Sequence, residues 1–270
     1  ENVMKKACYF NKLFGVVYCA VILLLMAHSV DGQTKKDVIQ EIEAMQWITE
    51  QYPPFNYRDA KNKQVKGIAV DVLMAMFDRL GVNLTQKDLK LQPWARGYQT
   101  ALKKPGTALF STTYTEERNK LFKFVYPILP TRVSLIAKKS RNLKIKSAAD
   151  MNGLKIGVIR NDIGDLLVRA LGVDDKALTA KASVDNLVQM LYRDRLDAIA
   201  YAEDIVSHQS QLVGFDPNAF EPIYLLKESH MGYAFHMSTE GDVIDTLQKA
   251  LDALWEDGTV DRIREKYLKK

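Results

Sequence analysis

Segments with strand-like and helix-like spacing alternate along this chain, and the alternating cycle occurs twice. In the first half, a helical pattern runs from Val70 to Leu80 and ends at Gly81, and the apolar run 107–110 follows further on. In the second half, the buried-strand pattern 154–159 precedes a helix that is expected to end at Gly172. Such alternation favours mainly parallel sheets with helices on both faces. A polar, basic stretch separates the two cycles, so we expect two α/β lobes.

The remaining elements are placed by the same periodicities. Further strands are expected at 42–48, 84–91, 133–137, 197–202 and 233–235, and further helices at 183–191, 203–212, 242–255 and 260–267. Two prolines in Tyr52-Pro53-Pro54-Phe55 end the first strand, because proline cannot continue a hydrogen-bonded strand. Ligands of open α/β sheets bind at the carboxyl ends of strands. If the lobes face each other, the polar corners after these strands meet in one cleft.

The N-terminal segment has the pattern of a secretory signal peptide. We interpret Met4 as the natural start and residues 1–3 as a non-native segment. Lysines follow Met4, and the apolar run 13–27 comes after them. This run is shorter than the ~20 residues that a membrane-spanning helix needs. We therefore interpret 1–32 as the non-native start and the signal peptide. Cleavage is expected near Ser29–Gly32, with export to the periplasm.

Composition excludes several classes of function. Both cysteines, Cys8 and Cys19, lie inside the predicted signal peptide, so the mature chain would have no disulfide, thiol nucleophile or thiolate metal site. The formal charge of +5 includes three lysines and one glutamate from the first 29 residues. The small remaining excess of basic groups is evenly spread and does not indicate a nucleic-acid partner.

The corner Ser111-Thr112-Thr113-Tyr114-Thr115-Glu116-Glu117-Arg118 carries the strongest chemical signal. It follows the apolar run 107–110, so hydroxyls, free backbone N–H groups and a guanidinium would converge where a strand enters a helix. Helix starts favour anions, and arginine can hold a carboxylate through two parallel hydrogen bonds. The alternative interpretation is an ordinary N-cap at Thr115 with a solvated arginine. From these residues alone, both interpretations stay open.

The ordered motifs resemble the family 3 extracellular solute-binding proteins, the periplasmic receptors of polar amino acid ABC importers. The similarity begins at Trp47 and extends to the C-terminus. The motifs in family order are Tyr52-Pro53-Pro54-Phe55, Gly67-Ile68-Ala69-Val70-Asp71, Trp94, Thr113-Tyr114-Thr115-Glu116-Glu117-Arg118, Phe124-Val125-Tyr126-Pro127, Leu154-Lys155-Ile156-Gly157-Val158, Asp197-Ala198-Ile199 and Asp257-Gly258-Thr259-Val260 with Lys266-Tyr267.

The resemblance implies a two-lobed periplasmic binding protein fold of type II. Its two mainly parallel sheets, flanked by helices, would be joined by a two-strand hinge near 130–134 and 224–232. Lobe one would comprise 40–130 plus 233–270, and lobe two 134–224. A small polar solute that contacts both lobes would stabilise the closed form for an ABC permease in the inner membrane. We expect a monomer that binds a carboxylate-bearing solute, an amino acid or an organic acid.

The resemblance also implies roles for individual residues. Arg118 would bind a carboxylate with help from Ser111 and Thr113, while Tyr52 and Trp94 would pack on the solute. Two positions depart from the family pattern. Ala202 stands where an acid usually holds the ammonium group, and Arg160-Asn161-Asp162 replaces a Gly-Thr pair. Asp162 or Glu203 could bind an amine instead, and Arg160 or Arg96 could bind a second carboxylate; for Arg96 we favour a solvated arginine.

Two other functions stay open. A few proteins of this fold are dehydratases or lytic enzymes, for which Glu50, Asp162 and Glu203 would be the candidate acids or bases. A soluble sensory subunit that presents the ligand to a receptor would use the same closed form. The four histidines have no metal-binding spacing, and we expect no metal, no cofactor and no enzymatic activity.

Overall fold

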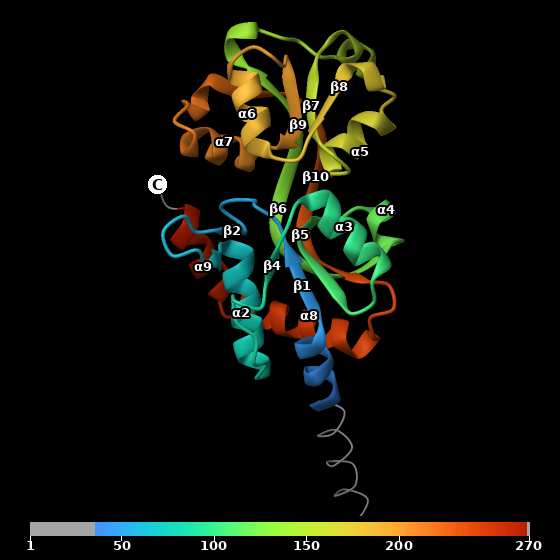
Figure 1. Cartoon of the computed structure of the whole chain (residues 1–270), viewed down its shortest axis with the longest axis vertical. Helices are drawn as coiled ribbons and strands as arrows, with labels where there is room; N and C mark the ends of the chain where they lie inside the picture. Colours follow the sequence, from blue (N-terminus) through green and yellow to red (C-terminus); the bar gives the residue numbers. More distant parts are fainter. Residues whose placement is uncertain (1–35, 269–270) are drawn as a thin grey trace, which may run out of the picture.

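Two long strands run side by side through the whole molecule (Figure 1). They are β6 (Phe122–Lys138) and β10 (Phe220–His236), which pair antiparallel from one end to the other. This computed structural model describes residues 36–268, so the predicted signal peptide lies outside the described residues. The other elements gather around the two ends of this strand pair and form two lobes, which we call lobe one (lower in Figure 1) and lobe two (upper).

Lobe one contains both the first part of the chain and its last part. Its elements are helical residues 36–44, β1 (Gln46–Thr49), the hairpin of β2 (Tyr57–Arg58) and β3 (Val65–Lys66), α2 (Ile68–Leu80), β4 (Lys90–Leu91), α3 (Trp94–Lys103), β5 (Thr107–Thr113), α4 (Glu116–Asn119), α8 (Gly241–Glu256) and α9 (Thr259–Leu268).

Lobe two contains the middle of the chain. Its elements are the 3-10 turns at Lys139–Arg141 and Ala148–Gly153, β7 (Ile156–Ile159), α5 (Ile163–Ala170), a 3-10 turn at Asp175–Ala177, β8 (Leu178–Lys181), α6 (Val184–Tyr192), β9 (Ala198–Ala202), α7 (Glu203–Leu212) and a 3-10 turn at Pro217–Ala219. The points at which the chain was expected to pass from one lobe to the other, 130–134 and 224–232, lie within β6 and β10.

One ladder of hydrogen bonds connects the strands of both lobes. The strand order is β4-β1-β5-β10-β6-β9-β7-β8. β4, β1 and β5 are parallel in lobe one, as are β9, β7 and β8 in lobe two, while β10 and β6 join them antiparallel. The fold is therefore a mixed α/β fold whose two parallel groups are continuous through the crossing strands.

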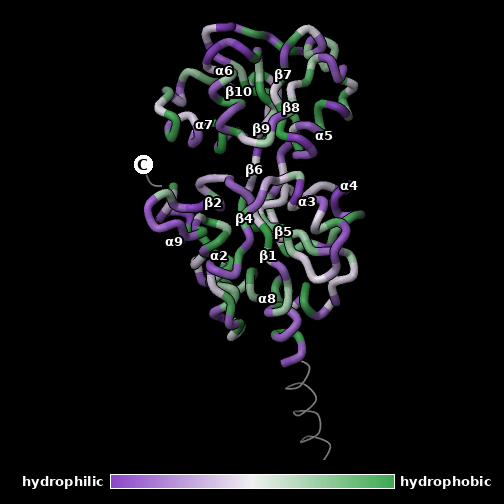
Figure 2. Tube along the Cα trace, viewed as in Figure 1, coloured by the Kyte–Doolittle hydropathy of each residue, from purple (hydrophilic) through white to green (hydrophobic). Residues whose placement is uncertain are grey.

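Apolar side chains from the strands fill each lobe. Trp47 lies at the centre of lobe one, with edge-to-face contacts to Phe77, Tyr233 and Phe235 at centroid distances of 5.1, 6.4 and 5.6 Å. Such pairs stabilise a core beyond the area that they bury. Figure 2 shows hydrophobic residues along the inner strands and hydrophilic residues around the β2–β3 hairpin. This packing fixes the position of the strands whose carboxyl ends carry site residues.

Two predictions of secondary structure were wrong in part. Residues 42–44 end a helix rather than begin a strand, because Ile42 is buried on a helical face and β1 begins only at Gln46. Of the strand expected at 84–91, only Lys90–Leu91 is a strand. The preceding residues form a turn in which the backbone N–H and the hydroxyl of Thr85 both donate to Asp88. That local alternative competes with the strand.

The Tyr52–Phe55 turn is held against the start of α2. The backbone N–H groups of Ile68 and Ala69 donate to the carbonyls of Pro54 and Phe55 at 3.1 and 2.9 Å. Gly67 has φ 129°, and a side chain there would overlap the Phe55 carbonyl. The carbonyls of the turn thereby accept hydrogen bonds from the first backbone N–H groups of α2, which have no acceptor within the helix. This contact keeps the turn beside the carboxyl end of β1.

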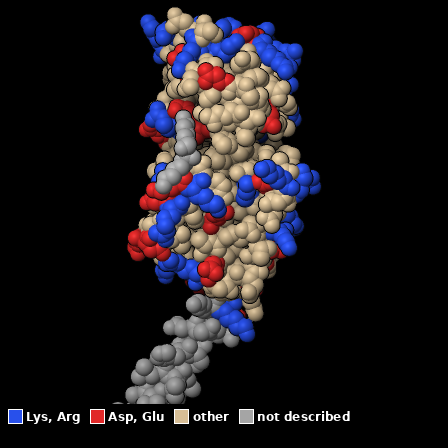
Figure 3. All heavy atoms as spheres, turned by 90° about the vertical axis from the view of Figure 1, so that its left-hand side faces the viewer, with Lys and Arg blue, Asp and Glu red and all other residues tan. Residues whose placement is uncertain are grey.

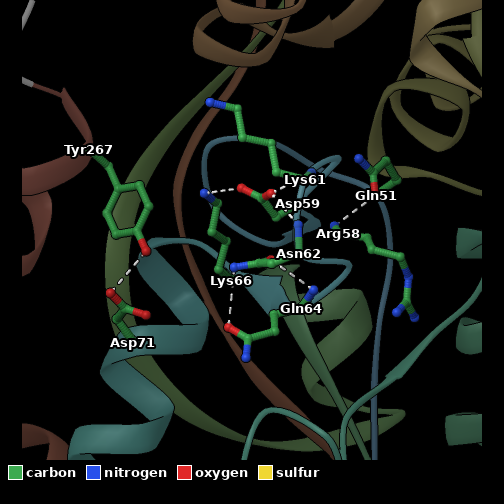
Figure 4. A network of polar contacts seen from close by, with 9 residues as sticks. All are labelled: Gln51, Arg58, Asp59, Lys61, Asn62, Gln64, Lys66, Asp71 and Tyr267. Atoms are coloured by element: carbon green, nitrogen blue, oxygen red, sulfur yellow. Dashed lines mark hydrogen bonds and ion pairs between the residues drawn. The ribbon is translucent and has the colours of Figure 1, made fainter.

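The C-terminal helix is anchored beside the same turn. The Tyr267 hydroxyl and the Lys266 ammonium both donate to Asp71 of α2, at 2.9 and 2.7 Å. Figure 4 shows the contact of Tyr267 with Asp71 next to the β2–β3 hairpin, where Asp59 pairs with Lys66. On the face drawn in Figure 3, Lys and Arg lie among Asp and Glu over lobe one. The last family motif, Lys266-Tyr267, therefore has a structural role.

Candidate functional site

Arg118 lies in a short helix and points into the interior of the molecule. The Thr115 hydroxyl accepts a hydrogen bond from the Arg118 backbone N–H at 3.1 Å, which caps α4. The N-cap prediction is therefore confirmed, but the solvated arginine is wrong because Arg118 is only 2% exposed. Its guanidinium lies over the rings of Trp94 and Tyr98, at 5.2 and 5.5 Å from the ring centroids.

Within residues 36–268, most of the Arg118 guanidinium has no hydrogen-bond acceptor. Nη1 donates to the Thr113 carbonyl at 3.1 Å, whereas Nε and Nη2 are buried and make no hydrogen bond in this part of the chain. Burial lowers the Arg118 pKa, and the nearby Asp162 carboxylate opposes that shift. Unpaired N–H groups on a buried cation are costly, since the group has lost its water. The guanidinium therefore has free donors with which it can bind an anion from outside the chain.

Asp162 faces Arg118 from the other lobe. It follows the carboxyl end of β7, stands at the N-cap position of α5 and is 8% exposed. Its Oδ1 lies 3.9 Å from Nη2 of Arg118, too far for a hydrogen bond. Burial raises the Asp162 pKa, and the Arg118 charge opposes that rise. One positive and one negative group thus face each other across the lobe boundary without being bonded.

Glu50 brings a second carboxyl group to the same region. It directly follows β1 and is partly buried. Burial raises the Glu50 pKa well above its usual value, Asp162 raises it further, and Arg118 opposes the rise. The sequence offered Glu50 only as a candidate acid or base for an enzyme. Its position as the first polar residue beyond β1 is the signal that could have placed it in the cleft.

Aromatic rings close the site from both lobes. The Tyr52 ring of lobe one meets the Tyr201 ring of β9 edge to face, with centroids 5.8 Å apart. Tyr52 is 6% and Tyr201 2% exposed. Burial raises the pKa of both phenols well above the usual value, and the nearby carboxylates add to that effect. Sequence reasoning missed Tyr201, because it lies inside an apolar strand pattern.

Trp94 joins the two lobes directly. It begins α3, and its indole N–H donates to the Asn161 carbonyl at 3.0 Å. Asn161 adopts the left-handed conformation at φ 60°, and its own N–H donates to Asp165 at 2.9 Å. Trp94 thus contacts the Arg118 guanidinium and the corner that carries Asp162. Asn161 contacts Trp94 through its backbone carbonyl. The sequence alone predicted only that Asn161 lies in the cleft.

Ser111 and Thr113, the two residues of β5 that the resemblance assigns to the site, have partners inside lobe one. Ser111 has φ 61°, and its hydroxyl donates to the Asn56 side-chain carbonyl. Asn56 in turn donates to the Glu50 carbonyl at 2.8 Å, so Ser111 supports the loop that carries Glu50. Thr113 is 5% exposed and contacts Arg118 through its backbone carbonyl. Thr113 therefore contacts Arg118, and Ser111 lies two residues before Thr113 in β5. Contact of these two residues with a ligand carboxylate stays a prediction.

Glu203 and Arg160 lie away from the Arg118–Asp162 pair. Glu203 accepts a hydrogen bond from the Ser134 hydroxyl at 2.5 Å and lies 3.5 Å from Arg132, so its carboxylate faces the crossing strand β6. Arg160 is exposed and lines a cavity of about 400 Å³ between the lobes; Arg118 is not among the lining residues. Arg96 is exposed on α3.

The site offers charge complementarity and aromatic walls. Among residues 36–268, no cluster of three or more His, Cys, Asp or Glu side chains is placed to hold a metal ion. Within the same range, no helix is both long enough and apolar enough to cross a membrane. What the arrangement can do is hold a small molecule that carries a negative and a positive group.

Comparison with known proteins identifies the family. The sequence profile of the bacterial extracellular solute-binding proteins, family 3, matches residues 46–270. The chain belongs to this family. Its members are extracellular or periplasmic binding proteins rather than enzymes.

Individual family 3 proteins resemble the chain over most of their length. The L-cystine-binding protein TcyA of Bacillus subtilis is 25% identical over 221 residues, which are 80% of this chain and 77% of TcyA. The arginine-binding extracellular protein ArtP of the same organism is 25% identical over 223 residues, 80% of this chain and 82% of ArtP. The crystal structure of a mutant of ArgBP from T. maritima superposes with a TM-score of 0.72 at 21% identity, covering 86% of this chain and all of that chain. The two-lobed fold is thus shared, and the expected type II fold is confirmed.

Proposed function

We propose that this protein captures an amino acid between its lobes and delivers it to an ABC importer. One observation carries the proposal: buried Arg118 leaves Nε and Nη2 without acceptors while Asp162 faces it from the opposite lobe. A carboxylate can occupy both free guanidinium nitrogens through parallel hydrogen bonds. An ammonium group beside Asp162 would stabilise the ionised carboxylate and lower its raised pKa. A zwitterion supplies both groups.

Asp162, rather than Glu203, is the acid that we assign to the ammonium group. Glu203 already accepts from Ser134 and lies near Arg132, whereas the nearest charged partner of Asp162 is 3.9 Å away. Ala202 occupies the position where the family usually has an acid for the ammonium group. Asp162, which follows the neighbouring strand β7, would take over that role. The organic-acid alternative lacks an ammonium group and would leave the charge of Asp162 uncompensated.

Glu50 favours an amino acid whose side chain is cationic. Burial and Asp162 raise the Glu50 pKa, so a positive group on the ligand beside Glu50 would favour the ionised carboxylate. The ionised Glu50 and Asp162 would then carry two negative charges against the single charge of Arg118, and the ligand's own carboxylate would add a third. A second positive group on the ligand would balance the site. The rings of Tyr52, Tyr201 and Trp94 can cover a long side chain or stack on its cation. ArtP, one of the relatives, is an arginine-binding protein by name.

Closure would occur by bending of the crossing strands. We assign the hinge to 130–134 and 224–232, where Thr131 pairs with Ser229 and Arg132 with Glu228 between the lobes. A ligand shifts the equilibrium between the open and closed forms toward closure only if it binds the closed form more tightly than the open one. Arg118 and Glu50 belong to lobe one and Asp162 to lobe two, so a zwitterion contacts both sides and stabilises the closed form.

The test is a thermal-shift screen followed by calorimetry with matched ligands. L-arginine, agmatine, which lacks the carboxylate, and δ-guanidinovaleric acid, which lacks the α-ammonium, differ by one group each. Hundredfold excess of a bound ligand over its Kd adds about 2.7 kcal/mol of stability. We expect a shift with L-arginine and none with the other two. A shift with δ-guanidinovaleric acid equal to that with L-arginine would exclude the ammonium site.

Citrulline separates the cationic side chain from the amino acid backbone. It has nearly the shape of arginine but a neutral side chain, so weaker binding of citrulline than of arginine supports the role of Glu50. Glu50→Gln should then reduce the affinity for arginine more than that for citrulline. Equal affinities in the wild type would refute the cationic preference while leaving the amino acid proposal intact.

A further inference from the structure

Four cationic side chains of lobe two line two neighbouring hollows that share Lys181. Arg160 and Lys181 line the cavity of about 400 Å³ between the lobes. Lys181, Arg193 and Arg195 line a groove of about 250 Å³ along α6. Among the described residues 36–268, no Asp or Glu lines either hollow. We call Arg160, Lys181, Arg193 and Arg195 the basic strip.

The backbone holds the first two members side by side. Ile159 of β7 is in register with Lys181 of the parallel strand β8, and the Arg160 N–H donates to the Lys181 carbonyl at 3.1 Å. Both residues therefore stand at the carboxyl ends of neighbouring strands, at the rim that faces lobe one. Like charges held together in this way repel each other unless an anion lies between them.

The basic strip has no carboxylate partners in the part of the chain that the structure describes. None of its four side chains makes an ion pair there, whereas Arg141 pairs with Asp197 and Arg169 with Asp165 in the same lobe. The strip is thus a charged surface that nothing in residues 36–268 neutralises. Charge complementarity points to an acidic partner.

The part of the strip formed by Arg160 and Lys181 depends on lobe closure. Pro93, Trp94 and Ala95 of lobe one form the opposite wall of the cavity that Arg160 and Lys181 line. This hollow consequently exists only when the two lobes are together. Trp94 also lies against Arg118 and donates to Asn161, the residue next to Arg160. The same side chain therefore contacts the inner site and the outer cavity.

We propose that the basic strip binds an acidic polypeptide segment of the membrane permease when the lobes are closed. The proposal rests on the proposed function, since that function supplies closure and the permease. A polypeptide segment can enter a hollow that both lobes line and continue along the groove beside α6. Lys181 is only partly exposed, so a flat lipid surface would reach it less readily than a chain would.

The test measures binding of a fluorescently labelled, Asp- and Glu-rich peptide to the mature protein by anisotropy, with and without the amino acid selected by the thermal-shift screen. Arg160→Gln with Lys181→Gln, and Arg193→Gln with Arg195→Gln, are the strip variants. Lys63→Gln with Lys87→Gln is the matched control, because these lysines line a groove of lobe one and removing them changes the net charge equally.

We expect each strip variant to weaken peptide binding about tenfold and the control to change it less than about twofold. The amino acid should tighten peptide binding to the wild type. An equal loss in the control would overturn the proposal, because only net charge would then matter. Strip-dependent binding of phosphatidylglycerol vesicles without peptide binding would also overturn it in favour of a lipid surface.

The two proposals fail in distinguishable ways. If the amino acid raises the melting temperature but leaves peptide affinity unchanged, the closure-dependent partner site is refuted and the solute-binding function stands. If no amino acid raises the melting temperature, the proposed function fails, and the contrast between strip and control variants still tests the strip itself.

Discussion

Nη2 of Arg118 and Oδ1 of Asp162 face each other from opposite lobes at 3.9 Å. The two groups are close enough to influence each other's pKa and too far apart to form a hydrogen bond. Their separation leaves both with unused hydrogen-bonding capacity at the lobe boundary. A zwitterion beside this pair, with its carboxylate on Arg118 and its ammonium group on Asp162, would provide the missing partners and hold the lobes together.

The first prediction concerns the shape of the cation at Arg118. Arg118→Lys keeps the charge but removes the planar pair of donors, so the amino acid should bind about 10- to 100-fold more weakly by calorimetry. Arg96→Lys, on the exposed face of α3, is the matched control and should leave the Kd unchanged. Full affinity in Arg118→Lys would show that the carboxylate binds elsewhere.

The second prediction concerns the hydrogen bond between Trp94 and Asn161. Trp94→Phe keeps an aromatic ring but removes the indole donor, and one lost hydrogen bond of about 1 kcal/mol should weaken ligand binding about fivefold. Trp255→Phe also removes an indole donor, which binds the Pro127 carbonyl within lobe one. That control should lower the melting temperature without changing the Kd. Equal Kd values for Trp94→Phe and the wild type would contradict a role of this bond in closure.

The third prediction concerns pH. The folded state raises the Glu50 pKa, so the folded protein holds this proton more tightly than the unfolded chain. The resulting stability is fully present below the unfolded pKa of about 4.3 and is lost as pH rises through the folded pKa. Glu50→Gln should therefore be more stable than the wild type near pH 8 without ligand, and the difference should disappear near pH 4.

Differential scanning calorimetry across this pH range checks the third prediction. One kcal/mol corresponds to about 2–4 °C for a protein of this size. Glu256→Gln, at the exposed end of α8, serves as the control and should show no such pH-dependent gain. A Glu50→Gln variant that is less stable than the wild type near pH 8 would contradict a raised Glu50 pKa in the folded protein.

The fourth prediction separates support from ligand contact at Ser111. Its hydroxyl donates to Asn56, which holds the Glu50 carbonyl. Ser111→Ala should therefore cost about 1–3 kcal/mol of stability in urea unfolding, because it leaves a buried acceptor without its donor. The Kd should change by less than about threefold once the variant is folded. A selective loss of affinity at unchanged stability would instead make Ser111 a ligand contact.

The fifth prediction tests the packing that places Asp162. A Cβ atom at Gly164 would overlap the Ala200 carbonyl, so α5 can approach β9 only with glycine there. Gly164→Ala should destabilise the protein by about 1–3 kcal/mol and also weaken ligand binding, because α5 and its first residues would move outward. Gly153→Ala, where a Cβ meets no atom within 4 Å, should do neither.

The alternating α/β order, the helix ends and the corners that form the site follow from local patterns in the sequence. These features are local: Thr115 caps α4 within three residues, and Gly81 ends α2 in the left-handed conformation. Residues 84–89 and the strand at Leu178–Lys181 were not predicted correctly, because turn hydrogen bonds and pairing to a neighbouring strand decide such short segments.

Contacts between distant segments set which corner residues face one another, and no local pattern shows them. Trp94 and Asn161 are 67 positions apart, and Arg118 and Asp162 lie in different lobes, so no local pattern encodes their contact. The structure turned Glu203 toward Ser134, brought Glu50 and Tyr201 into the site, and left Arg160 outside it. These contacts arise because β6 and β10 set the position of one lobe against the other, and that position depends on packing throughout both lobes.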